Sequence, residues 1–220
     1  MQDSGGPLGG VAPPPAPSLP PWEDRDRYRL VDALYLTVRE VLFSPEQFFR
    51  RMPVGAGLGQ PLLFALIVGV LGWFANWMWS LTGSSLPLPF DEGPCRLLCH
   101  PVWSLGMLVL SPLFVVSSLF LRAGILHLGL ALVGAGRAGF EGTFRVVAYA
   151  DAILILAVLP FCGVLLAVVL GGPILTIVGL RQVHRTEGWR ATLAVLFPLL
   201  LCIASSSGLV MMALTRRLFD

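Results

Sequence analysis

Long apolar blocks, separated by short polar connections, dominate the amino-acid sequence of this chain. They reach or approach the roughly 20 residues that an α-helix needs to cross a bilayer. Their apolar positions are continuous rather than alternating, which predicts transmembrane helices and excludes an outer-membrane barrel. The blocks cover about residues 61–81, 102–133, 143–159, 164–180 and 191–214. The sequence therefore predicts an all-α fold, a polytopic membrane helical bundle of five transmembrane helices, in a membrane domain at 53–217.

Helix-breaking residues interrupt several of these blocks. The second block is longer than the hydrocarbon layer is thick, so it must tilt, bend at Pro112 or project from the membrane. Gly171-Gly172-Pro173 predicts a kink in the fourth block, and the fifth block contains Pro198.

Before the first block, apolar residues recur at helical spacing among charged ones. Residues 28–52 predict two amphipathic helices, the second capped by Ser44 with Pro45 at its first position. We interpret them as cytoplasmic helices in the plane of the membrane interface. The alternative is two cytoplasmic helices that pack on the protein itself. The predicted interfacial or partner-contact residues are Phe48, Phe49, Arg50 and Arg51.

The first 27 residues have a different composition. Residues 1–22 are rich in Gly, Pro and Ser and contain neither the basic region nor the apolar region of a signal peptide. This segment, residues 1–27, is predicted to be a disordered tail.

Composition supports a membrane protein. The chain is 55% hydrophobic and 13% charged, whereas a soluble domain carries about 25% charged residues. All 15 basic residues are Arg, and together with 24 Gly and 18 Pro this favours a GC-rich, bacterial genome. No basic stripe with interleaved aromatic residues lies outside the apolar blocks, so we expect no nucleic-acid partner.

The distribution of Arg predicts the orientation. Six Arg precede the first block, whereas the connection after it contains only Arg96. By the positive-inside rule, the N-terminus is cytoplasmic and the C-terminus lies outside the cell inner membrane. Arg216 and Arg217 break this pattern, and a fourth block that did not span would make the C-terminus cytoplasmic.

Four polar residues fall inside the second and third blocks. Counted from a turn near Ala138, Arg122 and Asp151 lie at similar depth in a helical hairpin, and so do His127 and Tyr149. We therefore predict an Arg122–Asp151 pair and a second polar contact between His127 and Tyr149. The favoured interpretation is structural, with the pairs fixing helix register. The alternatives are a proton or ion relay, or an Arg122 that extends to the interface and pairs with nothing.

Other candidate chemistry is sparse. Glu141 and Arg145 are spaced as an ordinary helix-surface pair. Cys95 and Cys99 form a possible disulfide, but a zinc site would need a second half-motif that the sequence lacks. Ser205-Ser206-Ser207 is interpreted as small residues that pack helices. We predict no catalytic, cofactor-binding or metal-binding residue.

An ordered set of motifs resembles the Yip domain family, named for Ypt/Rab-interacting proteins, over roughly residues 44–214. The motifs are Ser44-Pro45-Glu46-Gln47-Phe48-Phe49-Arg50, Gly142-Thr143-Phe144-Arg145-Val146-Val147-Ala148-Tyr149, Pro160 with Gly163, Gly179-Leu180 with His184, and Pro198. The resemblance implies five spans, a cytoplasmic N-terminus and no enzymatic activity. The Asp-Leu-Tyr-Gly-Pro motif of eukaryotic members is absent, which argues against a Rab-type GTPase partner and favours a bacterial-type member.

The function that follows is that of a membrane-organising, scaffolding or trafficking-type factor, without a cofactor. Its expected partners are the lipid bilayer and other membrane proteins in a homo- or hetero-oligomer. For a eukaryotic chain the location would be the ER or Golgi membrane. The alternative function is a small transporter or permease subunit that uses the four intramembrane polar residues.

Overall fold

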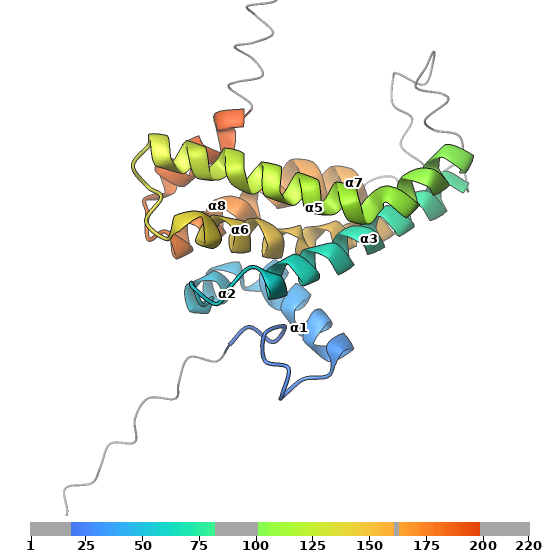
Figure 1. Ribbon diagram of the computed structural model, residues 1–220, viewed down its shortest axis with the longest axis horizontal. Helices are drawn as coiled ribbons and strands as arrows, with labels where there is room; N and C mark the ends of the chain where they lie inside the picture. The colour runs from blue at the N-terminus through green and yellow to red at the C-terminus, as the bar shows by residue number, and fades with distance from the viewer. Residues whose placement is uncertain (1–18, 82–100, 161–162, 199–220) are drawn as a thin grey trace, which may run out of the picture.

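The computed structural model describes residues 19–81, 101–160 and 163–198, and this part of the chain is helical without β-strands. The all-α class is thereby confirmed. Figure 1 shows the helices, which are α1 (Leu30–Phe43), α2 (Pro45–Arg51), α3 (Gly59–Leu81), α5 (Pro101–Leu132), α6 (Gly139–Ala150), the 3₁₀ helix η1 (Asp151–Val158), α7 (Gly163–Leu165), the π-helix η2 (Leu166–Gly171) and α8 (Gly172–Val183). The chain is helical again over 188–198.

Helix α6 forms the centre of the bundle. Every residue from Gly142 to Ala150 is buried, and α6 contacts α3, α5 and α8. Helices α5 and α6 form the predicted hairpin and lie side by side in Figure 1. The short helix α2 packs against α8, and α1 packs against α2 and η1.

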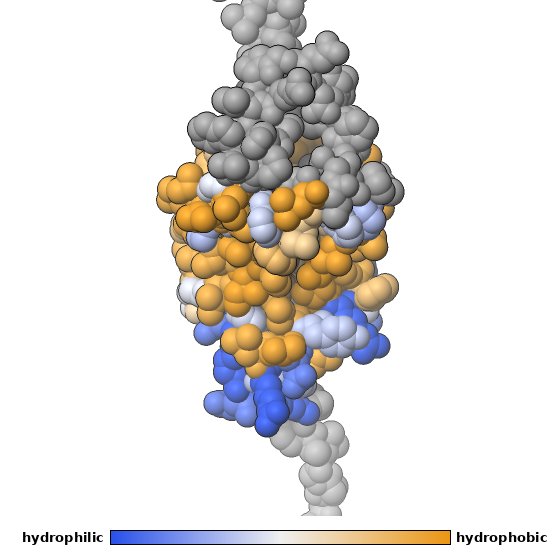
Figure 2. All heavy atoms as spheres, turned by 90° about the vertical axis from the view of Figure 1, so that its right-hand side faces the viewer, coloured by the Kyte–Doolittle hydropathy of each residue, from blue (hydrophilic) through white to orange (hydrophobic). Residues whose placement is uncertain are grey.

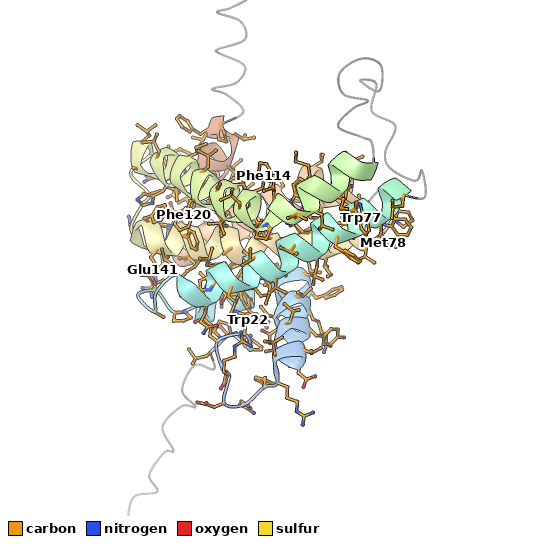
Figure 3. The ribbon with its side chains drawn as sticks, turned by 45° about the vertical axis from the view of Figure 1, so that its right-hand side comes forward. Trp22, Trp77, Met78, Phe114, Phe120 and Glu141 are labelled. Atoms are coloured by element: carbon orange, nitrogen blue, oxygen red, sulfur yellow. The ribbon has the colours of Figure 1, made fainter. Side chains whose placement is uncertain are left out.

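Two described helices are long and apolar enough to cross a membrane, over Gly59–Trp79 in α3 and Leu105–Leu132 in α5. Only 22% of each apolar window is buried inside the protein, so neither is the core helix of a soluble fold. Apolar side chains cover the middle of the face in Figure 2, and polar ones gather below it, where the N-terminal elements lie. Trp77 and Met78 project near the end of α3 in Figure 3. Exposed apolar surface of this extent indicates contact with lipid.

The third and fourth apolar blocks are not single straight α-helices. The third changes from α to 3₁₀ geometry at Asp151, and the fourth contains the π-helix η2 before Pro173. Pro173 lacks an N–H and its ring crowds the preceding turn, which explains why the helix widens there. The described residues therefore do not confirm the five-span count, and residues 199–214 of the fifth block lie outside them.

The predicted disordered tail is wrong in its last part. Residues 19–28 form turns rather than an extended tail, and Trp22 is fully buried. The indole contributes a large apolar surface to the core, where it packs edge-on against Phe64. Burial of this side chain helps to hold the segment against the bundle. Residues 1–18 lie outside the described part.

Glycine at position 179 permits the close approach of three helices. A Cβ there would lie 2.5 Å from Cγ1 of Val146 on α6 and 3.1 Å from Cζ of Phe49 on α2. We expect Gly179→Ala to lower the free energy of unfolding by about 1–3 kcal/mol, because the helices must separate. Thermal unfolding in detergent measures this. Gly124→Ala is the matched control, since a Cβ at Gly124 meets no atom within 4 Å. Equal effects of the two variants would contradict the prediction.

Candidate functional site

Arg122 and Asp151 form a two-pronged ion pair between α5 and η1. Nη1 of Arg122 donates to Oδ1 of Asp151 at 2.8 Å, and Nη2 donates to Oδ2 at 2.6 Å. The Asp151 side chain is 6% exposed, whereas that of Arg122 is 46% exposed. The structure thus brings together the two residues that counting from the hairpin turn placed at one depth. The guanidinium neutralises a carboxylate that would be costly to bury alone.

The position of Asp151 follows from the local backbone. It caps the C-terminal end of α6 and is the first residue of η1, where the hydrogen-bonding pattern tightens. Gly171 of η2 lies against the following turn, since a Cβ at Gly171 would lie 2.3 Å from Cγ1 of Ile153. Two irregular helices therefore meet beside the ion pair, and irregular turns inside helices are frequent at functional sites.

A cavity of about 290 Å³ lies next to this pair. Arg122 and Asp151 form part of its wall, Thr176 of α8 contributes a hydroxyl, and most of the rest is apolar. The hydroxyl of Thr176 donates to the backbone oxygen of Gly172 at 2.7 Å. The ion pair therefore supplies the charged part of an otherwise apolar cavity.

The predicted contact between His127 and Tyr149 is wrong. Nδ1 of His127 lies 3.1 Å from Oγ1 of Thr143, while the hydroxyl of Tyr149 donates to Glu23. Equal depth did not bring the two side chains together, because His127 on α5 contacts α6 at Thr143, whereas Tyr149 projects from α6 towards Glu23. The four polar residues of the second and third blocks thus belong to three separate contacts.

His127 belongs to a polar chain that includes the fully buried His184 at the end of α8. Oγ1 of Thr143 lies 3.0 Å from Nε2 of His184, and the backbone N–H of Ala138 donates to Nδ1 of His184 at 3.2 Å. Because Nδ1 accepts this bond, the ring proton of neutral His184 is on Nε2 and points to Thr143. The chain joins α5, α6 and α8 at the hairpin end of the bundle.

We expect the protein to lose stability as the pH falls from about 6.5 towards 4. Burial, and after it the nearby His127, lowers the pKa of His184 from 6.5 to about 4. Between pH 6.5 and about 4, His184 is protonated in the unfolded chain but stays neutral in the folded protein. Acid therefore favours the unfolded state. The expected loss is on the order of 1 kcal/mol by about pH 5.5.

Thermal unfolding measured across this pH range tests the expectation. His184→Gln, which cannot titrate, should flatten the pH dependence between pH 6.5 and 4. An unchanged slope in His184→Gln would assign the effect to other groups.

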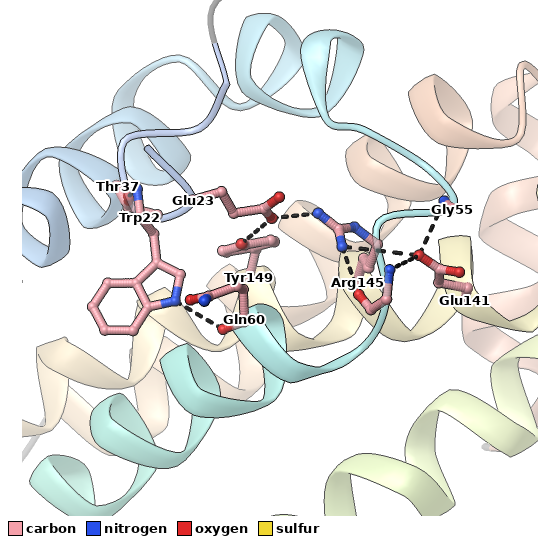
Figure 4. Close-up of polar contacts among 9 residues, drawn as sticks. Trp22, Glu23, Thr37, Gly55, Gln60, Glu141, Arg145 and Tyr149 are labelled. Carbon is pink, nitrogen blue, oxygen red and sulfur yellow. Dashed lines mark hydrogen bonds and ion pairs between the residues drawn. The ribbon is translucent and has the colours of Figure 1, made fainter. Parts of the chain in front are cut away.

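Among the residues that the structure describes, Arg145 is the most buried charged residue, with a side chain that is 0% exposed. It forms an ion pair with Glu23, which also accepts a hydrogen bond from Tyr149 (Figure 4). Nη1 of Arg145 donates to the backbone oxygen of Gly57 at 2.7 Å. We call Glu23, Arg145 and Tyr149 the Glu23 network. It joins the N-terminal segment and the α2–α3 connection to the central helix.

Glu141 extends this arrangement towards the surface. Its Oε1 accepts the backbone N–H of Gly55 at 3.0 Å and of Gly57 at 2.8 Å. Both glycines have positive φ, 90° and 88°, so the connection takes a shape that residues with a Cβ rarely adopt. Oε1 of Glu141 lies 3.9 Å from Nη1 of Arg145. The predicted helix-surface pair is therefore wrong for Arg145, which is part of the core.

Trp22 completes the attachment of the N-terminal segment. Its backbone N–H donates to Oγ1 of Thr37 at 2.9 Å, and its indole N–H donates to the backbone oxygen of Gln60 at 2.8 Å (Figure 4). The guanidinium of Arg25 lies 3.6 Å from the centre of the indole ring. Glu23 and Trp22 were missed as site residues because they were assigned to the tail. The available signal was a Trp followed by an acid directly after the Pro-rich stretch.

The predicted interfacial residues of α2 separate into two groups. Phe48 and Phe49 are each 1% exposed and pack edge-on against each other, so their assignment to an interface is wrong. Phe48 also packs against Tyr149 of the Glu23 network. Arg50 is exposed, and Arg51 forms an ion pair with Glu40 of α1.

The described ranges contain no group of three His, Cys, Asp or Glu residues that could hold a metal ion. The possible disulfide between Cys95 and Cys99 lies outside the described residues.

Comparison with known families decides the identity of the chain. The sequence model of the Yip1 domain matches residues 39–209, which is most of the chain. The chain belongs to the Yip1 domain family. The match spans α2, the Arg122–Asp151 pair and α8, whereas Glu23 precedes it. No curated protein and no solved structure is similar enough to match.

Membership of the Yip1 family agrees with the geometry in general terms. The family consists of membrane proteins that are generally not catalytic, and the exposed apolar surfaces of α3 and α5 suit a bilayer. The chain is accordingly a membrane-associated helical protein of this family.

Proposed function

We propose that this Yip1-family chain is a non-enzymatic, multi-pass protein that organises or scaffolds its membrane, as a trafficking-type factor does. The observation that carries the proposal is the attachment of a folded polar segment to an apolar bundle. Trp22 and the Glu23 network hold residues 19–58 against α6, while α3 and α5 keep exposed apolar surfaces. We call residues 19–58 the platform. A rigid platform that is fixed to membrane helices is the architecture that a scaffold requires.

The proposed topology has five spans with the N-terminus in the cytoplasm of a bacterial inner membrane. The Arg distribution supports this orientation. Alkaline phosphatase and green fluorescent protein fused after residues 90, 136, 161 and 186 would test it. Fluorescence is expected at 136 and 186, and phosphatase activity at 90 and 161. The reversed pattern would contradict the proposed orientation, and the same side at both 136 and 161 would contradict five spans.

The proposed membrane contact of the platform is the outer face of α1. Val31 is 72% exposed and Tyr35 is 64% exposed, and they lie one turn apart on the same helix face. Arg39 is exposed nearby. Exposed apolar residues beside Arg are typical of a helix at the headgroup layer. This assigns the interfacial role to α1, since the aromatic residues of α2 are buried.

A co-purification experiment tests the scaffold. Two full-length copies with different tags would be expressed together and extracted from native membranes in mild detergent. We expect the second copy, or a constant set of membrane proteins identified by mass spectrometry, to be recovered with the first. A monomer without constant companions would contradict the proposal.

The second candidate function is a small transporter, favoured by the cavity beside Asp151 and the π-helix η2. Proteoliposomes loaded with a pH-sensitive dye separate the two candidates. The scaffold predicts the same proton leak for the wild type and Asp151→Asn. A proton flux present in the wild type and lost in Asp151→Asn would support transport instead.

A further inference from the structure

We propose that the cavity beside the Arg122–Asp151 pair binds one bilayer lipid, with a lipid carbonyl oxygen on Arg122 and hydrocarbon against the apolar wall. The lipid class is neutral at the contact point, either the ester of a diacyl lipid or the ring carbonyl of an isoprenoid quinone. The inference stands independently of the scaffold function.

The hydrogen-bonding capacity of Arg122 points to the chemistry of the ligand. A guanidinium has five N–H donors, and Asp151 accepts two of them. The remaining donors have no protein acceptor among the residues that the structure describes, although Arg122 lines the cavity. In an apolar medium an N–H without an acceptor is costly, so a bound acceptor stabilises the site.

The charge of the site favours a neutral acceptor. Asp151 already compensates the positive charge of Arg122, and its carboxylate forms part of the same cavity wall. A phosphate or a second carboxylate would be placed close to Asp151 and repelled by it. A carbonyl oxygen accepts hydrogen bonds from the guanidinium without bringing a charge.

The remaining walls favour hydrocarbon over water. Ile125 and Leu126 of α5, Val147 of α6 and Val195 of the last described helix face the cavity. A stable buried water needs roughly two to four hydrogen-bonding partners, and these four side chains offer none. The cavity volume is about 290 Å³. Small-molecule sites have volumes of roughly 300–1,000 Å³, so this cavity is at the small end of that range. The cavity therefore suits the carbonyl region of a lipid and the first part of its chain.

The exposure of Arg122 provides a route for the rest of the lipid. Its side chain is 46% exposed, and the adjacent Leu121 on α5 is 64% exposed. The cavity is thus adjacent to the lipid-facing surface of α5. A lipid can enter sideways and leave its tail in the bilayer.

Native mass spectrometry of the full-length protein tests the proposal. The protein would be placed in nanodiscs of phosphatidylethanolamine and phosphatidylglycerol that also contain a small fraction of ubiquinone, and then released into the spectrometer. We expect one retained lipid per wild-type chain, and its mass distinguishes a phospholipid from the quinone. Absence of any retained lipid would overturn the proposal.

Two cavity-filling variants locate the retained lipid. Ile125→Trp and Val195→Phe fill the cavity from two different helices, α5 and the last described helix, and should each reduce occupancy at least several-fold. The matched controls are Leu128→Trp and Leu193→Phe, on the same helices at positions that are 54% and 41% exposed, and they should retain the lipid. Equal occupancy in filling and control variants would place the lipid elsewhere and overturn the proposal.

A third substitution tests the carbonyl contact. Arg122→Lys keeps the positive charge opposite Asp151 but loses the planar array of donors, so occupancy should fall several-fold while the fold is retained. Circular dichroism verifies the fold of each variant. Unchanged occupancy in Arg122→Lys would overturn the assignment of a carbonyl to Arg122.

Discussion

Replacing Arg145 by glutamine is expected to lower the free energy of unfolding by about 3–5 kcal/mol, the largest effect of any single substitution considered for this protein. The side chain is 0% exposed and pairs with Glu23, whose own side chain is 7% exposed. Glutamine would leave the Glu23 carboxylate buried without its counter-ion and would remove the bond to Gly57. Thermal or denaturant unfolding in detergent measures the loss.

The location of the damage is as informative as its size. Because Arg145 attaches the N-terminal segment, the variant should release residues 19–28 before the bundle unfolds. Hydrogen exchange at the backbone N–H of Trp22, which donates to Thr37, reports this release. Arg50→Gln is the control, since Arg50 is exposed on α2. A loss in Arg145→Gln as small as that in Arg50→Gln would show that the network does not support the fold.

Partial rescue distinguishes a pair from two independent contributions. In Arg145→Gln with Glu23→Gln, no uncompensated carboxylate remains. The double variant should therefore be more stable than the sum of the single effects predicts, by at least about 1 kcal/mol. Additive effects would contradict direct coupling between the two residues.

The second large effect is expected at the Arg122–Asp151 pair. Arg122→Gln leaves a carboxylate that is 6% exposed without its partner and should cost about 2–4 kcal/mol. The estimate is lower than for Arg145 because the Arg122 side chain is 46% exposed and its interactions are partly screened. Asp151→Asn should cost less, since an amide oxygen still accepts a hydrogen bond from Arg122.

A double-mutant cycle separates the structural role of this pair from a relay. If the pair fixes the register of α5 against η1, the effects of Arg122→Gln and Asp151→Asn are coupled, and the double variant is more stable than additivity predicts. Unfolding in detergent supplies the four free energies. Additive effects, combined with an Asp151-dependent proton flux, would reject the structural interpretation.

Part of this arrangement could be predicted because helix geometry relates position in the sequence to depth. Once the turn between α5 and α6 is placed near Ala138, each residue adds about 1.5 Å along either helix. Arg122 and Asp151 then fall at the same level, and the structure has them in contact. The same count failed for His127 and Tyr149, since depth does not determine the side of the helix from which a side chain projects.

The assignment of polar and apolar faces was less successful near the N-terminus. An amphipathic pattern identifies an apolar face but does not say whether lipid or protein covers it. In α2 the protein covers Phe48 and Phe49. In α1 the protein covers Ala33, Thr37 and Val41. The outer face of α1 keeps Val31 and Tyr35 exposed. The choice depended on α8 and η1, which follow more than 100 residues later in the sequence.

The sequence by itself determined that this chain is an all-helical membrane protein of the Yip1 type, because the length of an apolar run and the order of motifs are local properties. Only the tertiary structure decided that Glu23 pairs with Arg145 and Tyr149, which are 122 and 126 residues away. An exposed ion pair on a helix and a pair with a buried member, such as Glu141 and Arg145, have the same four-residue spacing in the sequence. Burial is set by what the rest of the chain packs around them, and here the packing turned an apparent tail into part of the core.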